Sequence, residues 1–244
     1  KVLNNIVYII IVMEVVTVKG LKENLDTLQT GDILLFAGSD FWFSKVVRWW
    51  TKSQFSHVGM VLRDPTYISP ELTGLYMWES GIESFADSED HVKKLGVQIT
   101  SLDELFETNP DYKLIVYRKL NTSIPKETIE RKIKDIHEVV HNRPYDINLY
   151  DFLMASANVK YVETPREPSK WFFINWLRPD HRRNDTYFCS ALVGFIYTEL
   201  GLLPSTTKWT ECFPDFFSSE DNPTMKITSG NYLDVDKLLY QKPK

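Results

Sequence analysis

The 244-residue sequence has little cysteine, little glycine and no excess of positive charge. Its two cysteines, Cys189 and Cys212, are too few for a disulfide scaffold or a four-cysteine zinc site. The 28 Lys and Arg residues are outnumbered by 33 Asp and Glu residues, and the net charge of −5 argues against a dedicated nucleic-acid binder. With 43% hydrophobic residues and only 10 Gly and 12 Pro, the chain is not compositionally disordered. We expect an ordinary globular core that holds without disulfides.

A long hydrophobic run is also missing. The stretch 2–18 is mostly apolar, but its longest uninterrupted run covers residues 6–13, which is too short to cross a bilayer. We therefore expect residues 1–20 to form a buried strand or helix. Because the chain opens on Lys1, this segment could also be the trimmed end of a signal or anchor that associates with a membrane. Residues 21–244 contain no repeat, low-complexity tract or Gly/Ser linker and are expected to form one domain.

The apolar pattern of residues 21–244 predicts an α+β domain. Short runs rich in β-branched and aromatic residues indicate strands of one antiparallel sheet at 33–36, 58–62, 75–78, 97–99 and 114–117. Helices are expected over 41–50, 126–141, 149–157 and 186–200, the last of them closed by Gly201. Residues 159–185, rich in proline and aromatic side chains, are expected to form a long irregular insertion that could cover a site.

Cys189 lies near the start of the predicted helix 186–200. The free N–H groups and the positive end of the helix dipole there stabilise a thiolate, which favours a reactive cysteine. A second interpretation is that Cys189 is a small core residue, because it shares one helical stripe with Val193, Ile196 and Leu200. Position alone leaves both interpretations open, so the choice depends on whether the thiol has a partner.

A nucleophilic thiol needs a base, and His57 is the candidate. It stands at the start of the predicted strand 58–62, where a rigid backbone could aim its imidazole. Glu79 follows the next predicted strand, 75–78. If the two strands form a hairpin, the carboxylate and the imidazole lie at the same edge, and Glu79 could fix the tautomer of His57. The sequence therefore predicts a thiol, a base and an orienting acid.

Five segments occur in an order that resembles a known family. They are Gly-Asp-Ile-Leu at 31–34, Ser-His-Val-Gly at 56–59, Glu79, Arg-Pro-Tyr-Asp at 143–146, and Tyr-Phe-Cys-Ser-Ala-Leu-Val at 187–193. With histidine first and cysteine last, the chain resembles the circularly permuted papain-like (NlpC-like) amidases and peptidases, which include the YiiX-type bacterial proteins. The resemblance covers about residues 30–202.

The resemblance implies a permuted papain-like (NlpC-like) fold, in which an antiparallel sheet packs against helices and the nucleophile stands at a helix N-terminus. It implies Cys189 as nucleophile, His57 as general base and Glu79 as its orienter, and it places three residues at the substrate cleft: Ser56, Tyr145 and Ser190. The implied activity is that of a thiol hydrolase or acyltransferase without cofactor or metal. Its substrate would be an amide bond of a peptide, a peptidoglycan fragment or a lipid. A catalytically idle binding module of the same fold is an alternative.

A zinc motif competes with this interpretation. Residues 137–141 match H-E-x-x-H, which on a helix places His137 and His141 one turn apart for zinc and supplies Glu138 as a base. The extended form of the motif fails, because Pro144 and Ile147 stand where glycine and histidine are required. Glu163 or Glu167 could supply a third ligand. Helical periodicity favours a solvated flank for the two histidines, so a zinc peptidase is retained only as an alternative.

Overall fold

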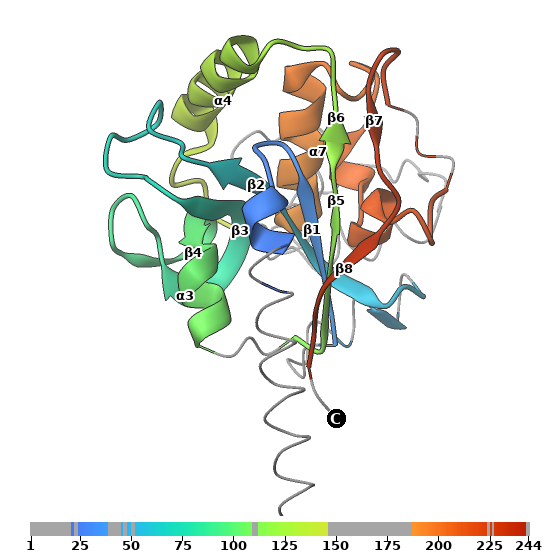
Figure 1. The fold of residues 1–244 in the computed structure, drawn as a ribbon, viewed down its shortest axis with the longest axis horizontal. Helices are drawn as coiled ribbons and strands as arrows, with labels where there is room; N and C mark the ends of the chain where they lie inside the picture. Colours follow the sequence, from blue (N-terminus) through green and yellow to red (C-terminus); the bar gives the residue numbers. More distant parts are fainter. Residues whose placement is uncertain are drawn as a thin grey trace, which may run out of the picture.

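The computed structural model describes residues 21, 24–38, 45, 48–49, 52–108, 112–145, 187–223, 225 and 227–242. Their predicted α+β class is confirmed: strands and helices alternate irregularly along the chain, and the sheet is antiparallel (Figure 1). The elements in chain order are β1 (Ile33–Ala37), β2 (Phe55–Arg63), β3 (Leu75–Ala86), β4 (Lys93–Ser101), α3 (Leu102–Glu107), β5 (Leu114–Arg118), β6 (Leu120–Asn121), α4 (Lys126–Val140), α7 (Cys189–Leu200), the 3-10 helices η1 (Trp209–Glu211) and η2 (Pro214–Phe217), β7 (Tyr232–Leu233) and β8 (Lys237–Gln241).

The main sheet has six strands in the order β4-β3-β2-β1-β5-β8. All five residues of β1 are buried, as expected for a strand that is covered on both faces. Ile33 and Leu35 belong to the apolar cluster on one face of the sheet, whereas Leu34 and Phe36 belong to the cluster on the other. This alternation follows from the two-residue period of a strand, so the sheet has a hydrophobic core on each side.

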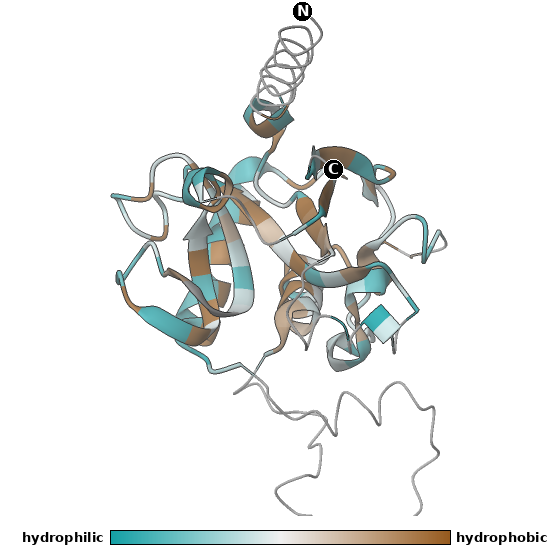
Figure 2. Ribbon diagram, turned by 90° about the horizontal axis from the view of Figure 1, so that it is seen from below, coloured by the Kyte–Doolittle hydropathy of each residue, from teal (hydrophilic) through white to brown (hydrophobic). Residues whose placement is uncertain are grey.

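The helices cover the two faces unequally. α4 and α7 contribute to the core that contains Ile33 and Leu35, while α3 contributes to the opposite core. α7 is buried over nearly its whole length, and Figure 2 shows hydrophobic residues gathered in the central strands with hydrophilic residues toward the periphery. The N-terminus of α7 therefore lies against the sheet, where any buried polar group must be satisfied by its neighbours.

The predicted helices at 126–141 and 186–200 are present, with one correction. The first is α4. The second begins only at Cys189, because Tyr187 is held in an isolated β-bridge and Phe188, the N-cap, has an extended backbone. Its end is confirmed: Gly201 takes the left-handed conformation, with a φ of 81°, that commonly terminates a helix.

The predicted strands are confirmed in position, but β3 is longer than predicted and other elements were missed. β3 continues to Ala86 rather than ending at residue 78, so Glu79 lies within the strand and not at its end. The missed elements include β8, a short and partly exposed edge strand that pairs with β5. Helix α3 was also not predicted, although Ser101 caps it by accepting a hydrogen bond from the backbone N–H of Glu104.

Three predictions fall outside the described residues: the form of the segment 1–20, the helix 149–157 and the insertion 159–185. Of the predicted helix 41–50, residues 45, 48 and 49 are described and are helical. In the part of the chain that the structure describes, we find no helix with the length and apolar character needed to cross a membrane.

Candidate functional site

The candidate site lies where β2 and β3 separate. The ladder between these strands ends at the pair of Met60 and Trp78, whereas β3 stays paired with β4 as far as Ala86. His57 precedes Met60 by three positions in β2, and Glu79 directly follows Trp78 in β3. The two side chains therefore come from strand segments that are no longer hydrogen-bonded to each other.

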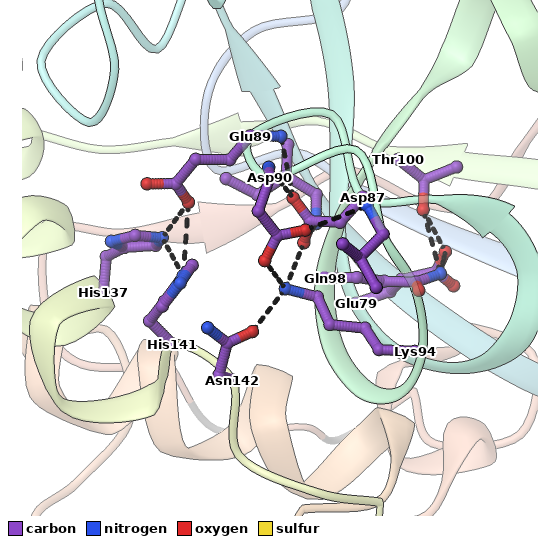
Figure 3. A network of polar contacts seen from close by, with 12 residues as sticks. Glu79, Asp87, Glu89, Asp90, Lys94, Gln98, Thr100, His137, His141 and Asn142 are labelled. Carbon is purple, nitrogen blue, oxygen red and sulfur yellow. Dashed lines mark hydrogen bonds and ion pairs between the residues drawn. The ribbon is translucent and has the colours of Figure 1, made fainter.

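The carboxylate of Glu79 is buried and accepts three hydrogen bonds. His57 Nε2 lies 2.5 Å from Glu79 Oε2. Glu79 Oε1 accepts from the hydroxyl of Thr100 at 2.6 Å and from the amide of Gln98 at 3.1 Å (Figure 3). Glu79 and Gln98 are direct partners in the β3–β4 ladder, so the sheet register supplies these donors. Sequence reasoning missed Gln98 and Thr100; the available signal was two polar residues that alternate with Val97 and Ile99 in a predicted strand.

The pKa values of the pair move in opposite directions. Burial by itself would raise the pKa of Glu79, but the interactions with His57, Thr100 and Gln98 outweigh it and lower that pKa below 4.5. Burial by itself would lower the pKa of His57, but hydrogen-bonding and charge interactions with Cys189, and then with Glu79, raise it from 6.5 to about 10. The imidazole is therefore charged at neutral pH and interacts with both the thiol and the carboxylate.

Cys189 is the first residue of α7 and is 5% exposed. The N-cap, Phe188, makes no side-chain cap hydrogen bond, so no capping side chain occupies the free N–H groups at the start of this 12-residue helix. The positive end of the helix dipole therefore acts on the thiol of Cys189. Because Nε2 of His57 faces Glu79, the other ring nitrogen is the one available to the thiol. The structure thus brings together Cys189, His57 and Glu79, the three residues that the sequence predicted.

The chain leading into α7 is anchored on both sides. The carbonyl of Tyr187 accepts a hydrogen bond from Ser80 Oγ at 2.6 Å, and its N–H donates to the carbonyl of Pro144 at 3.1 Å. The carbonyl of Arg143 in turn accepts from the N–H of Val97 in β4 at 2.9 Å. A continuous set of backbone contacts therefore connects β4 to the residue two positions before Cys189.

The three residues assigned to the substrate cleft all adjoin this site in the fold. Tyr145 is half-buried and forms a parallel β-bridge with Tyr187. Ser56 and Ser190 each neighbour a member of the Cys189–His57 pair in sequence, and both are buried. Among the described residues, neither serine hydroxyl has a hydrogen-bond partner. A buried hydroxyl without a partner is uncommon, so both are candidates for contact with a bound molecule.

The other cysteine has a different environment. Cys212 is 2% exposed and its sulfur lies 3.8 Å from the carbonyl of Lys208. Burial, together with the nearby charges of Glu211 and Asp215, raises the pKa of Cys212 to about 12. Both features are typical of an unreactive core thiol.

A second polar cluster lies at the turn between β3 and β4. His137 and His141 of the H-E-x-x-H motif converge with Glu89, and the donor atoms of all three lie within 4.8 Å of one another (Figure 3). These three side chains could hold a metal ion.

The expected solvated flank is wrong for His137. This residue is 8% exposed and its ring lies 5.9 Å from that of Trp78. Burial, opposed by the charge of Glu89, lowers the pKa of His137. Glu138, the expected base, is exposed, and the carboxylate that meets the two histidines is that of Glu89, which was not among the predicted ligands. Glu163 and Glu167 lie outside the described residues.

Comparison with solved structures finds a likeness to the crystal structure of the metalloprotein YiiX from Escherichia coli O157:H7. The TM-score is 0.42 and the sequences are 16% identical over 88% of this chain and 97% of that chain. No protein-family model matches the chain, and a search of curated proteins finds no match.

The two cysteines should differ in reactivity. Cys189 stands at a helix N-terminus beside a charged imidazole, whereas the pKa of Cys212 is raised to about 12, so Cys189 should alkylate faster near neutral pH by roughly 100-fold or more. Timed labelling with iodoacetamide and peptide mapping measures both rates. His57→Ala should slow Cys189 only. Equal rates for the two cysteines in the folded protein would contradict an activated thiol.

Gly96 should be needed to position the start of α7. It has a φ of 147°, and a Cβ there would lie 2.2 Å from the carbonyl oxygen of Arg143. Gly96→Ala should push that segment from β4 and slow Cys189 labelling. Gly74→Ala is the matched control, because Gly74 also has a positive φ of 116° but a Cβ there meets nothing within 4 Å. The Gly96 variant should lose about 1–3 kcal/mol more stability in urea unfolding; equal losses would contradict the close approach.

The charged His57 should make stability depend on pH. Its folded pKa is raised, so its contribution is complete below about pH 6.5 and is lost as the pH rises toward about 10. The pKa of Glu79 is lowered from 4.5, so its contribution is present above that pH and is lost as the pH falls. The stability difference between wild type and His57→Gln, measured by urea unfolding, should be largest between pH 4.5 and 6.5. A difference that increases above pH 6.5 would have the wrong sign.

Proposed function

We propose that the protein is a cysteine-dependent acyl hydrolase or acyltransferase of the permuted papain-like type, with Cys189, His57 and Glu79 as its catalytic residues. The observation that carries the proposal is the half-buried imidazole of His57, which interacts with the thiol on one side and with a fully hydrogen-bonded carboxylate on the other. A merely structural His–Glu pair would need no cysteine at a helix N-terminus beside it.

The chemistry begins with the thiolate of Cys189. Its sulfur attacks the carbonyl carbon of the substrate, and a C–S bond forms as the carbonyl oxygen takes up negative charge. The tetrahedral intermediate then collapses, the C–N bond breaks, and His57 gives the leaving nitrogen the proton from its ring nitrogen facing the thiol. An acyl-enzyme on Cys189 remains.

A water molecule resolves the acyl-enzyme. Neutral His57 takes a proton from the water as its oxygen attacks the acyl carbon, and the C–S bond then breaks to return the thiolate and the charged imidazole. A hydroxyl or amine in place of water would make the reaction an acyl transfer. Glu79 keeps the ring oriented and offsets its positive charge throughout, because Thr100 and Gln98 hold the carboxylate in place.

The N-terminus of α7 supports the developing oxyanion. Cys189 is the first residue of α7, so its backbone N–H has no partner within the helix and would donate to the carbonyl oxygen as it acquires charge. The substrate class proposed is an amide of a peptide, a peptidoglycan fragment or a lipid, with Ser56, Ser190 and Tyr145 as candidate contacts. The same three catalytic groups also serve thioesters and esters, which are convenient reporter substrates.

A covalent probe tests the proposal directly. The protein is incubated with a peptidyl acyloxymethyl ketone, and intact mass followed by peptide mapping locates the adduct. We expect one adduct on Cys189, none on Cys212, and none in Cys189→Ala. Absence of labelling at Cys189 under conditions that label free thiols would favour the idle binding module instead.

Mutant rates separate the catalytic roles. Cys189→Ala and His57→Ala should each reduce hydrolysis of a responsive thioester or amide to background, and the double variant should be little worse because the two groups act as a unit. Glu79→Gln keeps the size but removes the charge that faces the imidazole, so a loss of roughly 10- to 1,000-fold is expected.

The control for the glutamate variant is Glu71→Gln, which changes an exposed glutamate in a turn and should leave the rate unchanged. Melting temperatures of both variants are measured alongside turnover. Unchanged turnover per folded Glu79→Gln molecule, with a lowered melting temperature, would make Glu79 structural and leave a Cys189 and His57 dyad.

A further inference from the structure

Two imidazoles and one carboxylate meet at the end of α4. His137 belongs to the last turn of the helix, His141 is its C-cap, and Glu89 comes from the turn between β3 and β4 (Figure 3). His137 Nε2 lies 2.9 Å from Glu89 Oε2, and His141 Nδ1 lies 3.2 Å from the same oxygen. The two ring nitrogens are 3.1 Å apart. The three donor atoms therefore form a nearly equilateral triangle.

The hydrogen bond between the two imidazoles and their ion-pair contacts with Glu89 do not satisfy all three sides of this triangle. Glu89 Oε2 is buried, yet it receives no hydrogen bond of ordinary geometry from any described residue. Each imidazole nitrogen carries at most one proton, directed along its own ring, so three mutual contacts at one point cannot all be good hydrogen bonds. A cation at the centre would satisfy all three lone pairs at once.

The distances between the three ligand atoms, and the fact that two are imidazole nitrogens and one is a carboxylate oxygen, indicate which ion would bind. Zinc bound tetrahedrally at about 2.0–2.1 Å separates its ligand atoms by about 3.4 Å, only a few tenths of an ångström more than the edges seen here. Calcium and magnesium prefer oxygen ligands, whereas two imidazoles with one carboxylate suit zinc and its transition-metal neighbours. We propose that Glu89, His137 and His141 bind a divalent ion of the zinc class, which fastens the β3–β4 turn to the end of α4.

The ligand-bearing turn is held in place before any ion binds. Asp87 accepts hydrogen bonds from the backbone N–H of Glu89 at 2.7 Å and of Ile99 at 3.1 Å. Lys94 pairs with Asp87 at 2.9 Å and donates to the side chain of Asn142, the residue after His141, at 2.6 Å. Supporting contacts of this kind orient metal ligands and raise affinity.

The site differs from that of a zinc peptidase of the H-E-x-x-H type. Glu138, which would act as the base there, is exposed, and Glu89 provides the carboxylate ligand from another element. The side chain of His141 is 30% exposed, so a water can complete the tetrahedron from the solvent side. The proposal is independent of any activity of Cys189.

Zinc titration of metal-free, untagged protein tests the site. The measurement uses both wild type and Cys189→Ala, so that zinc bound by the thiol is recognised, with a chromophoric chelator as competitor. We expect one zinc ion per chain in both proteins, with a dissociation constant below about 10 μM. The melting temperature should rise by roughly 5–10 °C at a hundredfold excess over that constant.

Ligand variants locate the ion. Glu89→Gln and His141→Ala should each weaken binding by about 100-fold or more, whereas the matched control Glu138→Gln should bind like wild type. Far-UV circular dichroism of each variant verifies folding; if Glu89→Gln does not fold, His141→Ala decides. The proposal is overturned by a dissociation constant above about 100 μM, by loss of binding in Cys189→Ala, by unchanged binding in the ligand variants, or by a loss in Glu138→Gln equal to that in Glu89→Gln.

Discussion

The arrangement of the site depends on one buried carboxylate. Removing Glu79 from water is unfavourable unless its charge is compensated, and the compensation comes from a different strand on each side: His57 from β2, Gln98 and Thr100 from β4. The carboxylate therefore fixes the geometry at the point where β2 leaves the sheet ladder. Interactions with Cys189, and then with Glu79, raise the pKa of His57, so the imidazole links the thiol to the carboxylate.

The position of Cys189 is decided by backbone contacts rather than by its helix alone. β4 binds the segment 143–145, that segment binds Tyr187, and Ser80 holds Tyr187 from the other side. These contacts keep the chain extended up to Phe188, so that α7 can begin only at Cys189. The delayed start matters chemically, because the thiol then stands at the dipole end of the helix rather than one turn inside it.

The β3–β4 hairpin carries two different kinds of polar chemistry. In its strands, Glu79 contacts His57, which also interacts with the thiol of Cys189. In its turn, Glu89 faces two histidines that offer lone pairs to a single point. The first carboxylate is saturated with hydrogen-bond donors and the second is not. This difference in hydrogen bonding distinguishes Glu79, which we propose orients His57, from Glu89, a candidate metal ligand, although both glutamates are paired with histidine.

Strand and helix periodicity and helix-end signals are local properties, so the α+β class, the antiparallel strands, α4 and the end of α7 at Gly201 could be predicted from the sequence. The convergence of Cys189, His57 and Glu79 was predicted from their residue types and from the expected hairpin, and the structure shows it. Their catalytic role stays a prediction. The donors that meet Glu79, the start of α7 and the acid that faces His137 depend on contacts between distant parts of the chain, which local patterns do not reveal. Gln98 lies beside Glu79 because the two residues are partners in the β3–β4 ladder. Glu89 and His137 are 48 positions apart in the sequence and meet only in the folded chain. Spacing within one helix suggested Glu138 as a base, with Glu163 or Glu167 as a third ligand. The direction of each side chain on that helix instead turns Glu138 to solvent and His137 toward Trp78.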